Sequence, residues 1–162
     1  MAAFDGILKF GVVSGGSIDY RPLPMGASEV VKAQSGRFVA DDGSGRGEIA
    51  GASSTRLLGY VESGDQTTSA TEGGTELPWM NDPTKAIKIP LRYDGSTYTQ
   101  NYADSIIGNK IDLVVVSDVQ YADATNSSND LLIVVGGKAA TSTTSNDGWL
   151  LVRMNESKLG DA

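Results

Sequence analysis

The chain has 162 residues, a formal net charge of −7, and neither cysteine nor histidine. A chain of this length corresponds to about one domain. The lack of cysteine excludes disulfides, thiolate metal sites and a cysteine nucleophile, and the lack of histidine removes the usual general base and the commonest metal ligand. The acidic balance argues against wrapping nucleic acid, which requires clustered Lys and Arg. No apolar run reaches the roughly 18 residues of a membrane span.

The first segment, residues 1–27, predicts an extended N-terminal arm. Its apolar side chains are interrupted by glycines and followed by Pro22 and Pro24, a spacing that disfavours helix. One interpretation is an edge strand of the chain's own sheet. The other is an arm that lies on a neighbouring molecule, because these side chains would otherwise expose a sizeable apolar patch. The candidate partner-binding residues of this segment are Phe4, Ile7, Leu8, Phe10 and Tyr20.

Residues 28–157 predict a single β domain. Short apolar stretches separated by glycine-rich turns are typical of a small β-barrel or a β-sandwich, so the expected fold class is mainly β. Within the domain, residues 62–84 are rich in Gly, Ser, Thr, Asp and Glu and predict one long surface loop. Trp79 lies in the one apolar island of that loop, where it either packs the loop onto the body or contacts another subunit; it is the sixth candidate partner-binding residue. Residues 158–162 are expected to be a frayed C-terminus.

Two apolar runs, residues 111–116 and 131–135, predict a pair of central strands. Both are rich in β-branched side chains at consecutive positions, which favours strands covered on both faces. The polar stretch between them, residues 117–130, predicts a loop. One apolar face is expected to be covered by the N-terminal arm, by the long loop or by another copy of the chain, and the last option predicts a homo-oligomer. Residues 87–91 alternate apolar with other side chains, and Pro90 predicts an edge strand or a strand end there.

The sequence offers few candidates for catalytic chemistry. The acidic, glycine-rich stretch 41–48 has the composition of a phosphate or calcium loop, but strand rather than helix is expected after it and the calcium ligand spacing is not matched, so a tight turn is predicted. No spacing singles out two carboxylates for acid–base catalysis. We therefore expect no enzymatic activity, no cofactor and no metal ion.

A texture of short strands and glycine turns recurs along the chain. It occurs at Val31–Gly47, at Leu58-Gly59-Tyr60, and again at residues 108–113 and 149–153. This texture resembles the decoration, or cement, proteins of tailed bacteriophages, although the insertion at residues 62–84 departs from their smallest members. The resemblance implies a small β protein that binds an assembled capsid shell, commonly as a trimer at local symmetry axes, with an N-terminal arm that contacts the shell. It carries no catalytic residue over to this chain.

The expected function is therefore that of a structural virion protein which binds the assembled capsid shell and stabilises it by clamping neighbouring capsid subunits. Its expected place is the capsid surface of the virion, after synthesis in the host cytoplasm. The expected partners are the major capsid protein and other copies of this chain, with a trimer favoured, and neither nucleic acid nor membrane. The alternative is a carbohydrate-binding or adhesive β-module of a phage fibre or tail, in which Trp79 stacks on sugar rings.

Overall fold

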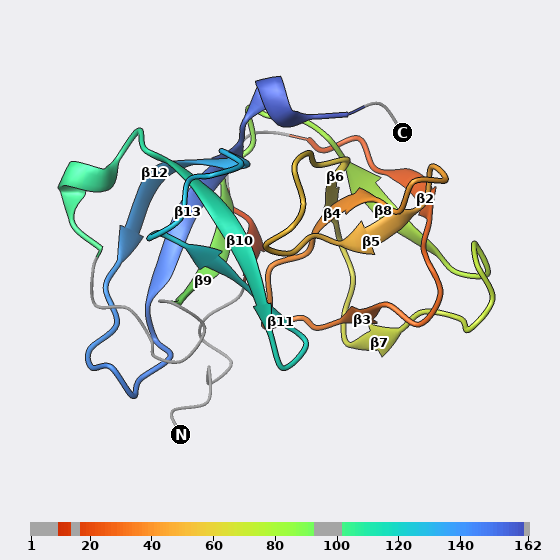
Figure 1. Cartoon of the computed structure of the whole chain (residues 1–162), viewed down its shortest axis with the longest axis horizontal. Coiled ribbons are helices and arrows are strands. Elements are labelled where there is room, and N and C mark those ends of the chain that lie inside the picture. The colour runs from red at the N-terminus through yellow and green to blue at the C-terminus, as the bar shows by residue number, and fades with distance from the viewer. Residues whose placement is uncertain (1–9, 14–16, 93–101, 161–162) are drawn as a thin grey trace.

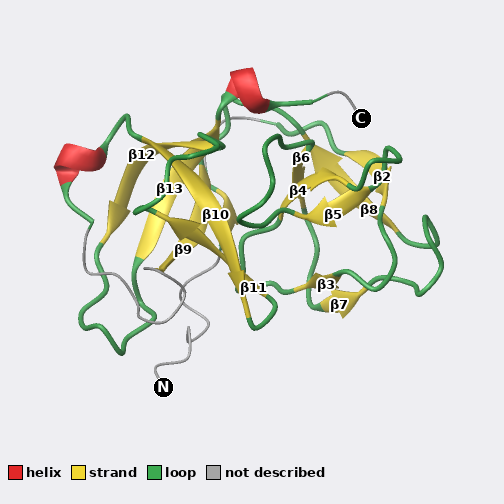
Figure 2. Cartoon of the chain, in the orientation of Figure 1, coloured by secondary structure: helices red, strands yellow, loops and turns green. Residues whose placement is uncertain are grey.

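The computed structural model describes residues 10–13, 17–92 and 102–160 of the chain. Strands make up 42% of the structure and helices 4%, so the predicted mainly-β class is confirmed (Figure 2). Helical turns of the described segments are short 3-10 turns, η1 (Asp104–Ile106) and η2 (Glu156–Lys158). In these same segments, no helix has the length and apolar character needed to cross a membrane.

Five strands close into a β-barrel, which confirms the barrel among the predicted architectures. Neighbours follow the order β9-β11-β10-β12-β13, and β13 pairs back onto β9 to complete the ring. The β9–β11 pair is parallel and the other pairs of the ring are antiparallel. Figure 1 shows this barrel in the left half of the molecule. Its strands are β9 (Ile87–Arg92), β10 (Lys110–Val116), β11 (Val119–Asp123), β12 (Leu132–Lys138) and β13 (Trp149–Met154), and the short strand β1 (Gly11–Val12) adds to β9.

The barrel forms because its strands alternate apolar and other side chains with a period of two. On β13, Leu150, Val152 and Met154 are at most 1% exposed and fill the interior. Strand β9 alternates in the same way and pairs along its length, so the edge-strand prediction for Pro90 is wrong. Proline is tolerated because β1 pairs with β9 only at Ile87 and Lys88, and β11 pairs with it only from Leu91 onward. Pro90 falls in the gap, where a backbone donor is not needed on that edge.

A second sheet packs against the barrel and occupies the right half of Figure 1. One face of the sheet shares a core cluster with the barrel interior, through residues such as Phe38, Tyr60 and Met80. The opposite face builds a second cluster around Leu23, Leu58 and Trp79. In order, the strands of this sheet are β2 (Arg21–Pro24), β8 (Glu76–Met80), β6 (Gly59–Val61), β4 (Phe38–Asp41) and β5 (Gly47–Ile49), and a separate two-stranded ribbon pairs β3 (Val30–Val31) with β7 (Gln66–Thr67).

The described part of the N-terminal segment agrees with the edge-strand interpretation, and the C-terminal end is more regular than the sequence predicts. The described part of the 1–27 arm contains β1 and β2, because Gly11 and Val12 pair with β9 and residues 21–24 pair with β8. At the other end, Leu159 bridges to Leu57, and the Gly160 amide donates to the Leu57 carbonyl over 2.7 Å. Residues 158–160 are therefore held by backbone hydrogen bonds rather than frayed.

The predicted long loop at residues 62–84 contains strands β7 and β8. The polar composition of residues 62–84 hides strand β8. In the structure Glu76 and Pro78 are exposed while Leu77 and Trp79 are buried, so the segment alternates as a half-buried strand. The polar stretch 117–130 likewise contains β11, whose inward side chains include a glutamine.

The two central runs pair as predicted, through Lys110 with Ile133 and Ile111 with Leu132. Closure of the barrel buries their inward side chains, and loop 124–130 covers part of the outer surface of β10. What remains outside is mostly half-buried, with Val115 at 39% exposure. One copy of the chain thus shelters most of the apolar surface that suggested an oligomer, so a homo-oligomer needs a different argument.

Candidate functional site

The structure separates the six candidate partner-binding residues. Phe4, Ile7 and Leu8 lie outside the described residues. Phe10 is 6% exposed and Trp79 is 4% exposed, so both are buried within their own chain, while Tyr20 is half-buried against the barrel-side core. Phe10 and Tyr20 come together around a buried arginine, Arg37, whereas Trp79 lies in the cluster on the opposite face of the second sheet.

Arg37 fixes the point at which the N-terminal segment joins the body. Its guanidinium is 2% exposed, and its Nη2 donates to the carbonyl of Phe10 over 3.0 Å while Nη1 donates to the carbonyl of Ala33 over 2.8 Å. The neighbouring Gly11 has φ of 131°, and a Cβ there would lie 3.0 Å from Arg37 Nη2. Glycine is therefore required for the chain to pass this close to the guanidinium.

Beyond Phe10, backbone pairing with β9 also holds the N-terminal segment to the barrel. Gly11 and Val12 pair with Lys88 and Ile87, and the amide of Val13 donates to the carbonyl of Ala86 over 2.9 Å. We call Phe10–Val13, together with Arg37, the arm root. The root is a fixed seam between the N-terminal segment and the barrel.

A carboxylate and an aromatic ring lie beside the charged group of Arg37. Glu62 Oε1 lies 3.6 Å from Arg37 Nη2, but its side chain is 46% exposed, so solvent screens much of that attraction. The guanidinium carbon lies 5.3 Å from the centre of the Tyr60 ring. Burial raises the pKa of Tyr60 and also that of Tyr20; nearby Glu62 adds to both increases and Arg37 opposes them. Both phenols therefore stay protonated at neutral pH, which suits positioning rather than proton transfer.

Trp79 is held from both sides within the chain. Its ring belongs to the second core cluster, and the guanidinium carbon of Arg21 lies 4.5 Å from the ring centre. A sugar ring could stack on Trp79 only after displacing that cation. The burial of Trp79 thus agrees with the interpretation that it packs its segment onto the body.

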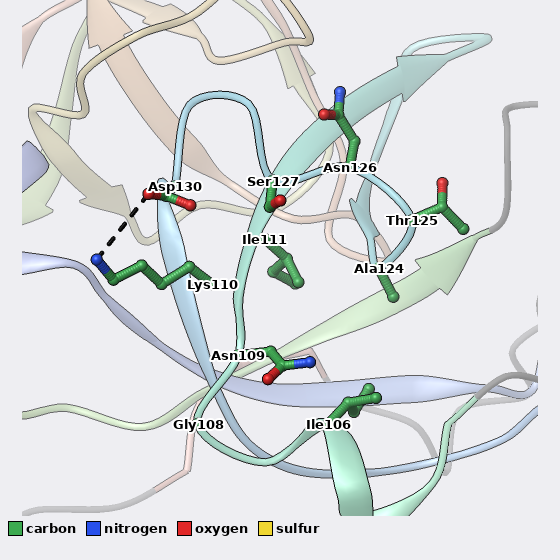
Figure 3. Close-up of a pocket in the computed structure, with 10 residues that line it drawn as sticks. All are labelled: Ile106, Gly108, Asn109, Lys110, Ile111, Ala124, Thr125, Asn126, Ser127 and Asp130. Carbon is green, nitrogen blue, oxygen red and sulfur yellow. Dashed lines mark ion pairs between the residues drawn. The ribbon is translucent and has the colours of Figure 1, made fainter.

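A separate surface pocket of about 450 Å³ opens beside the barrel (Figure 3). It lies between turn η1, the start of β10 and the loop that follows β11. Figure 3 shows Lys110 reaching toward Asp130, and the two charged groups are 3.9 Å apart. The pocket lining is largely polar and comprises Ile106, Gly108, Asn109, Lys110, Ile111, Ala124, Thr125, Asn126, Ser127 and Asp130.

A buried carboxylate holds the loop that walls this pocket. Asp112 is fully buried, and its two oxygens accept from the amide of Asn129 over 3.1 and 3.0 Å. The amide of Asp112 in turn donates to the carbonyl of Asn126 over 2.9 Å. The pocket is therefore built on a fixed loop and presents amide, hydroxyl, ammonium and carboxylate groups, which can bind a small polar ligand through hydrogen bonds.

Sequence reasoning missed Arg37, Glu62 and Asp112. A usable signal existed for Arg37, which is a lone cation in the otherwise small and apolar stretch 35–40. No comparable signal marks Glu62, since it joins Arg37 only through the fold. Among the residues that the structure describes, no group of three or more acidic side chains is arranged to hold a metal ion.

Comparison with family models, with characterised proteins and with solved structures gives no match for this chain.

Proposed function

We propose that this chain is a structural virion protein that binds an assembled capsid shell through its N-terminal segment and stabilises the shell by clamping neighbouring capsid subunits. The arm root is the observation that carries the proposal. Arg37 and β9 fix the chain at Phe10–Val13, so the body has one defined point of attachment directly after residues 1–9. Phe4, Ile7 and Leu8 then supply the apolar contacts to the major capsid protein.

The proposed mechanism is geometric. The binding site is formed only when neighbouring subunits of the expanded shell come together, so binding stabilises that state by mass action. Several copies bound to one shell act with avidity, which makes a modest contact by each segment sufficient. A few buried aromatic and aliphatic side chains usually carry most of the energy of such an interface, and this favours Phe4 and Leu8 as anchors.

Cosedimentation with purified shells tests the proposal. Wild-type protein is expected to pellet with expanded shells and to remain in solution with unexpanded ones. The variant Phe4→Ser/Leu8→Ser is expected to lose at least tenfold in affinity, corresponding to about 1.4 kcal/mol. The matched control is Ile107→Ser, which removes an apolar side chain that is 49% exposed and lies outside the N-terminal segment, and it should bind like the wild type. If Phe4→Ser/Leu8→Ser binds shells as tightly as the control does, the N-terminal segment is not part of the interface.

The polar pocket supports a second candidate, carbohydrate binding. Its volume of about 450 Å³ and its polar lining fit one or two sugar rings held by hydrogen bonds rather than by stacking on Trp79. A glycan array would detect such a ligand. Loss of the signal in Asn109→Ala, with the signal kept in the exposed control Gln66→Ala, would place the ligand in this pocket. An array without hits would reject this candidate.

A further inference from the structure

The outer surface of the barrel over β10, β12, β13 and β9 carries cations set between apolar side chains. Because Leu150 and Val152 fill the interior, the alternate residues of β13 point outward. The strand register extends this pattern sideways across the neighbouring strands. The outward rows are Lys110–Ile133–Arg153, Gly136–Leu151–Lys88 and Lys138–Trp149, the last of which ends at the buried Pro90. We call this surface the cationic face.

The positive charge of this face is largely uncompensated. Lys110 has a carboxylate at 3.9 Å, that of Asp130. Within the described segments, Lys88, Lys138 and Arg153 form no ion pair with a carboxylate. Partial burial lowers the pKa of Lys88, and the nearby ammonium of Lys138 lowers it further. Cations are thus crowded together in a chain whose net charge is −7.

The aromatic ring on the cationic face is already occupied. The ammonium of Lys88 lies 4.2 Å from the centre of the Trp149 ring. A nucleic-acid base or a sugar would need that ring face for stacking. The arrangement instead presents fixed ammonium groups beside half-buried Leu151 and Ile133, a mixture that matches an acidic protein surface with an apolar centre.

A surface of that complementary kind exists on the same molecule. A groove of about 390 Å³ lies where β3 and β5 of the sheet region meet the end of the β10–β11 hairpin, and it is lined by Glu29, Glu48, Asp118 and the exposed Val115. Burial raises the pKa of Glu48, and neighbouring Glu29 raises it further, so acidic groups are crowded here as cations are on the barrel. We call this the acidic groove.

The two surfaces lie on different parts of the chain. Strand β10 pairs with β12 only at Lys110 and Ile111 and then continues away from it to Val115. Figure 1 accordingly shows β12 and β13 at the left end of the molecule and β3 and β5 in the right half. Complementary surfaces at separate places favour a head-to-tail contact between copies, which closes into a ring if the rotation permits.

We propose that the cationic face of one copy docks onto the acidic groove of a second copy. The contact joins Lys88 and Lys138 of one molecule to the carboxylates around Glu48 of the next, with Val115 facing the apolar side chains between the cations. The inference goes beyond shell binding and does not depend on it, because self-association is measured on the purified chain alone.

Light scattering and sedimentation equilibrium on a charge-swap pair test this contact. At low ionic strength the wild type is expected to self-associate at about 100 µM or below and to dissociate as salt is added. Lys138→Glu and Glu48→Lys should each weaken self-association at least tenfold, because each sets like charges against one another. An equimolar mixture of the two variants should assemble again, which simple damage to the fold would not allow. The control Lys158→Glu changes the net charge by the same amount as Lys138→Glu, but in turn η2 and not in the rows of the cationic face. It should associate like the wild type.

Three outcomes would overturn the proposal. These are a wild type that stays monomeric at low salt, a mixture of the two variants that does not assemble, and a loss of assembly in Lys158→Glu as large as in Lys138→Glu. A titration with labelled oligo-dT tests the other ligand that a cationic surface can bind, a polyanion. Binding of the oligonucleotide that is tighter than self-association and lost in Lys138→Glu would show a polyanion site instead.

Discussion

The side-chain amide of Gln120 hydrogen-bonds to both backbone groups of Phe38. The Phe38 amide donates to Gln120 Oε1 and Gln120 Nε2 donates to the Phe38 carbonyl, each over 2.9 Å. Nε2 also donates to the carbonyl of Ala50 over 2.7 Å. The Gln120 side chain therefore makes the hydrogen bonds to Phe38 that a neighbouring strand would make. It does so where the barrel meets the second sheet. It is fully buried, so bulk solvent does not compete for these bonds.

Replacing Gln120 by alanine should destabilise the whole domain. The change leaves the Phe38 amide and the Ala50 carbonyl without their Gln120 partner, whereas the Phe38 carbonyl keeps the Ala50 amide as a donor at 3.0 Å. Each buried orphan costs about 1–3 kcal/mol. We expect the free energy of unfolding to fall by about 3 kcal/mol or more, measured by urea denaturation. Gln66→Ala is the matched control, because Gln66 is exposed on β7 and should change stability by less than about 0.5 kcal/mol. A loss of similar size in both variants would contradict the role of Gln120.

Arg37→Met should loosen the arm root. It removes both hydrogen bonds from the guanidinium, so the carbonyl of Phe10 loses its buried donor. Hydrogen exchange of the Val13 amide, which donates to Ala86, should accelerate at least tenfold, and global stability should fall by about 1–3 kcal/mol. Arg56→Met is the control. Arg56 also donates to a carbonyl, that of Leu159, but at the exposed C-terminus, and its loss should leave Val13 unchanged. Unchanged exchange at Val13 in Arg37→Met would mean that the root is held by β-pairing alone.

Alkaline pH should destabilise the fold through Tyr60. Burial raises the pKa of Tyr60 above its ordinary value of 10.0. Above about pH 10 the unfolded chain releases this proton while the folded chain keeps it, so the folded state binds more protons and stability falls as pH rises. Below pH 10 the two states carry the same proton and this contribution does not vary. Thermal unfolding followed from pH 8 to pH 11 measures the decline.

Tyr60→Phe provides the control for that titration. Within the described residues the Tyr60 hydroxyl has no hydrogen-bond partner, so its removal should cost little at neutral pH. The variant should lose less stability between pH 10 and pH 11 than the wild type. Parallel curves for the two proteins would assign the decline to another group.

The parts of the fold that follow from local pattern were predictable. Apolar side chains at consecutive positions predict β10 and β12, and their alternation at every second position predicts β9. The barrel that these strands help to close is one of the two architectures that the sequence predicts. Strand β11 was not predictable, because its inward residue Gln120 is polar and its hydrogen-bond partner Phe38 is brought beside it only by the fold. For the same reason Pro90 predicted an edge, since the gap between the partners of β9 exists only in three dimensions.

The candidate site was predictable only in part. Apolar composition singled out the N-terminal segment, but the buried cation that anchors it joins residues 10 and 37, which no spacing rule connects. The sequence predicts Phe10 as a partner contact because the apolar N-terminal segment would otherwise expose a patch, and Trp79 because it lies in the one apolar island of a polar stretch. The structure instead places both in the chain's own packing, at 6% and 4% exposure. Sequence position identifies an aromatic residue, whereas its accessibility depends on the surrounding fold.

Removal of residues 2–9, with the arm root left intact, tests the central claim most directly. The cut spares Phe10 and the pairing of Gly11 and Val12 with β9, so the thermal unfolding curve should match that of the full chain. In cosedimentation with expanded shells, the truncated protein is expected to bind at least a hundredfold more weakly than the full chain, about 2.7 kcal/mol. Binding by the folded, truncated protein that equals binding by the full chain would contradict the account.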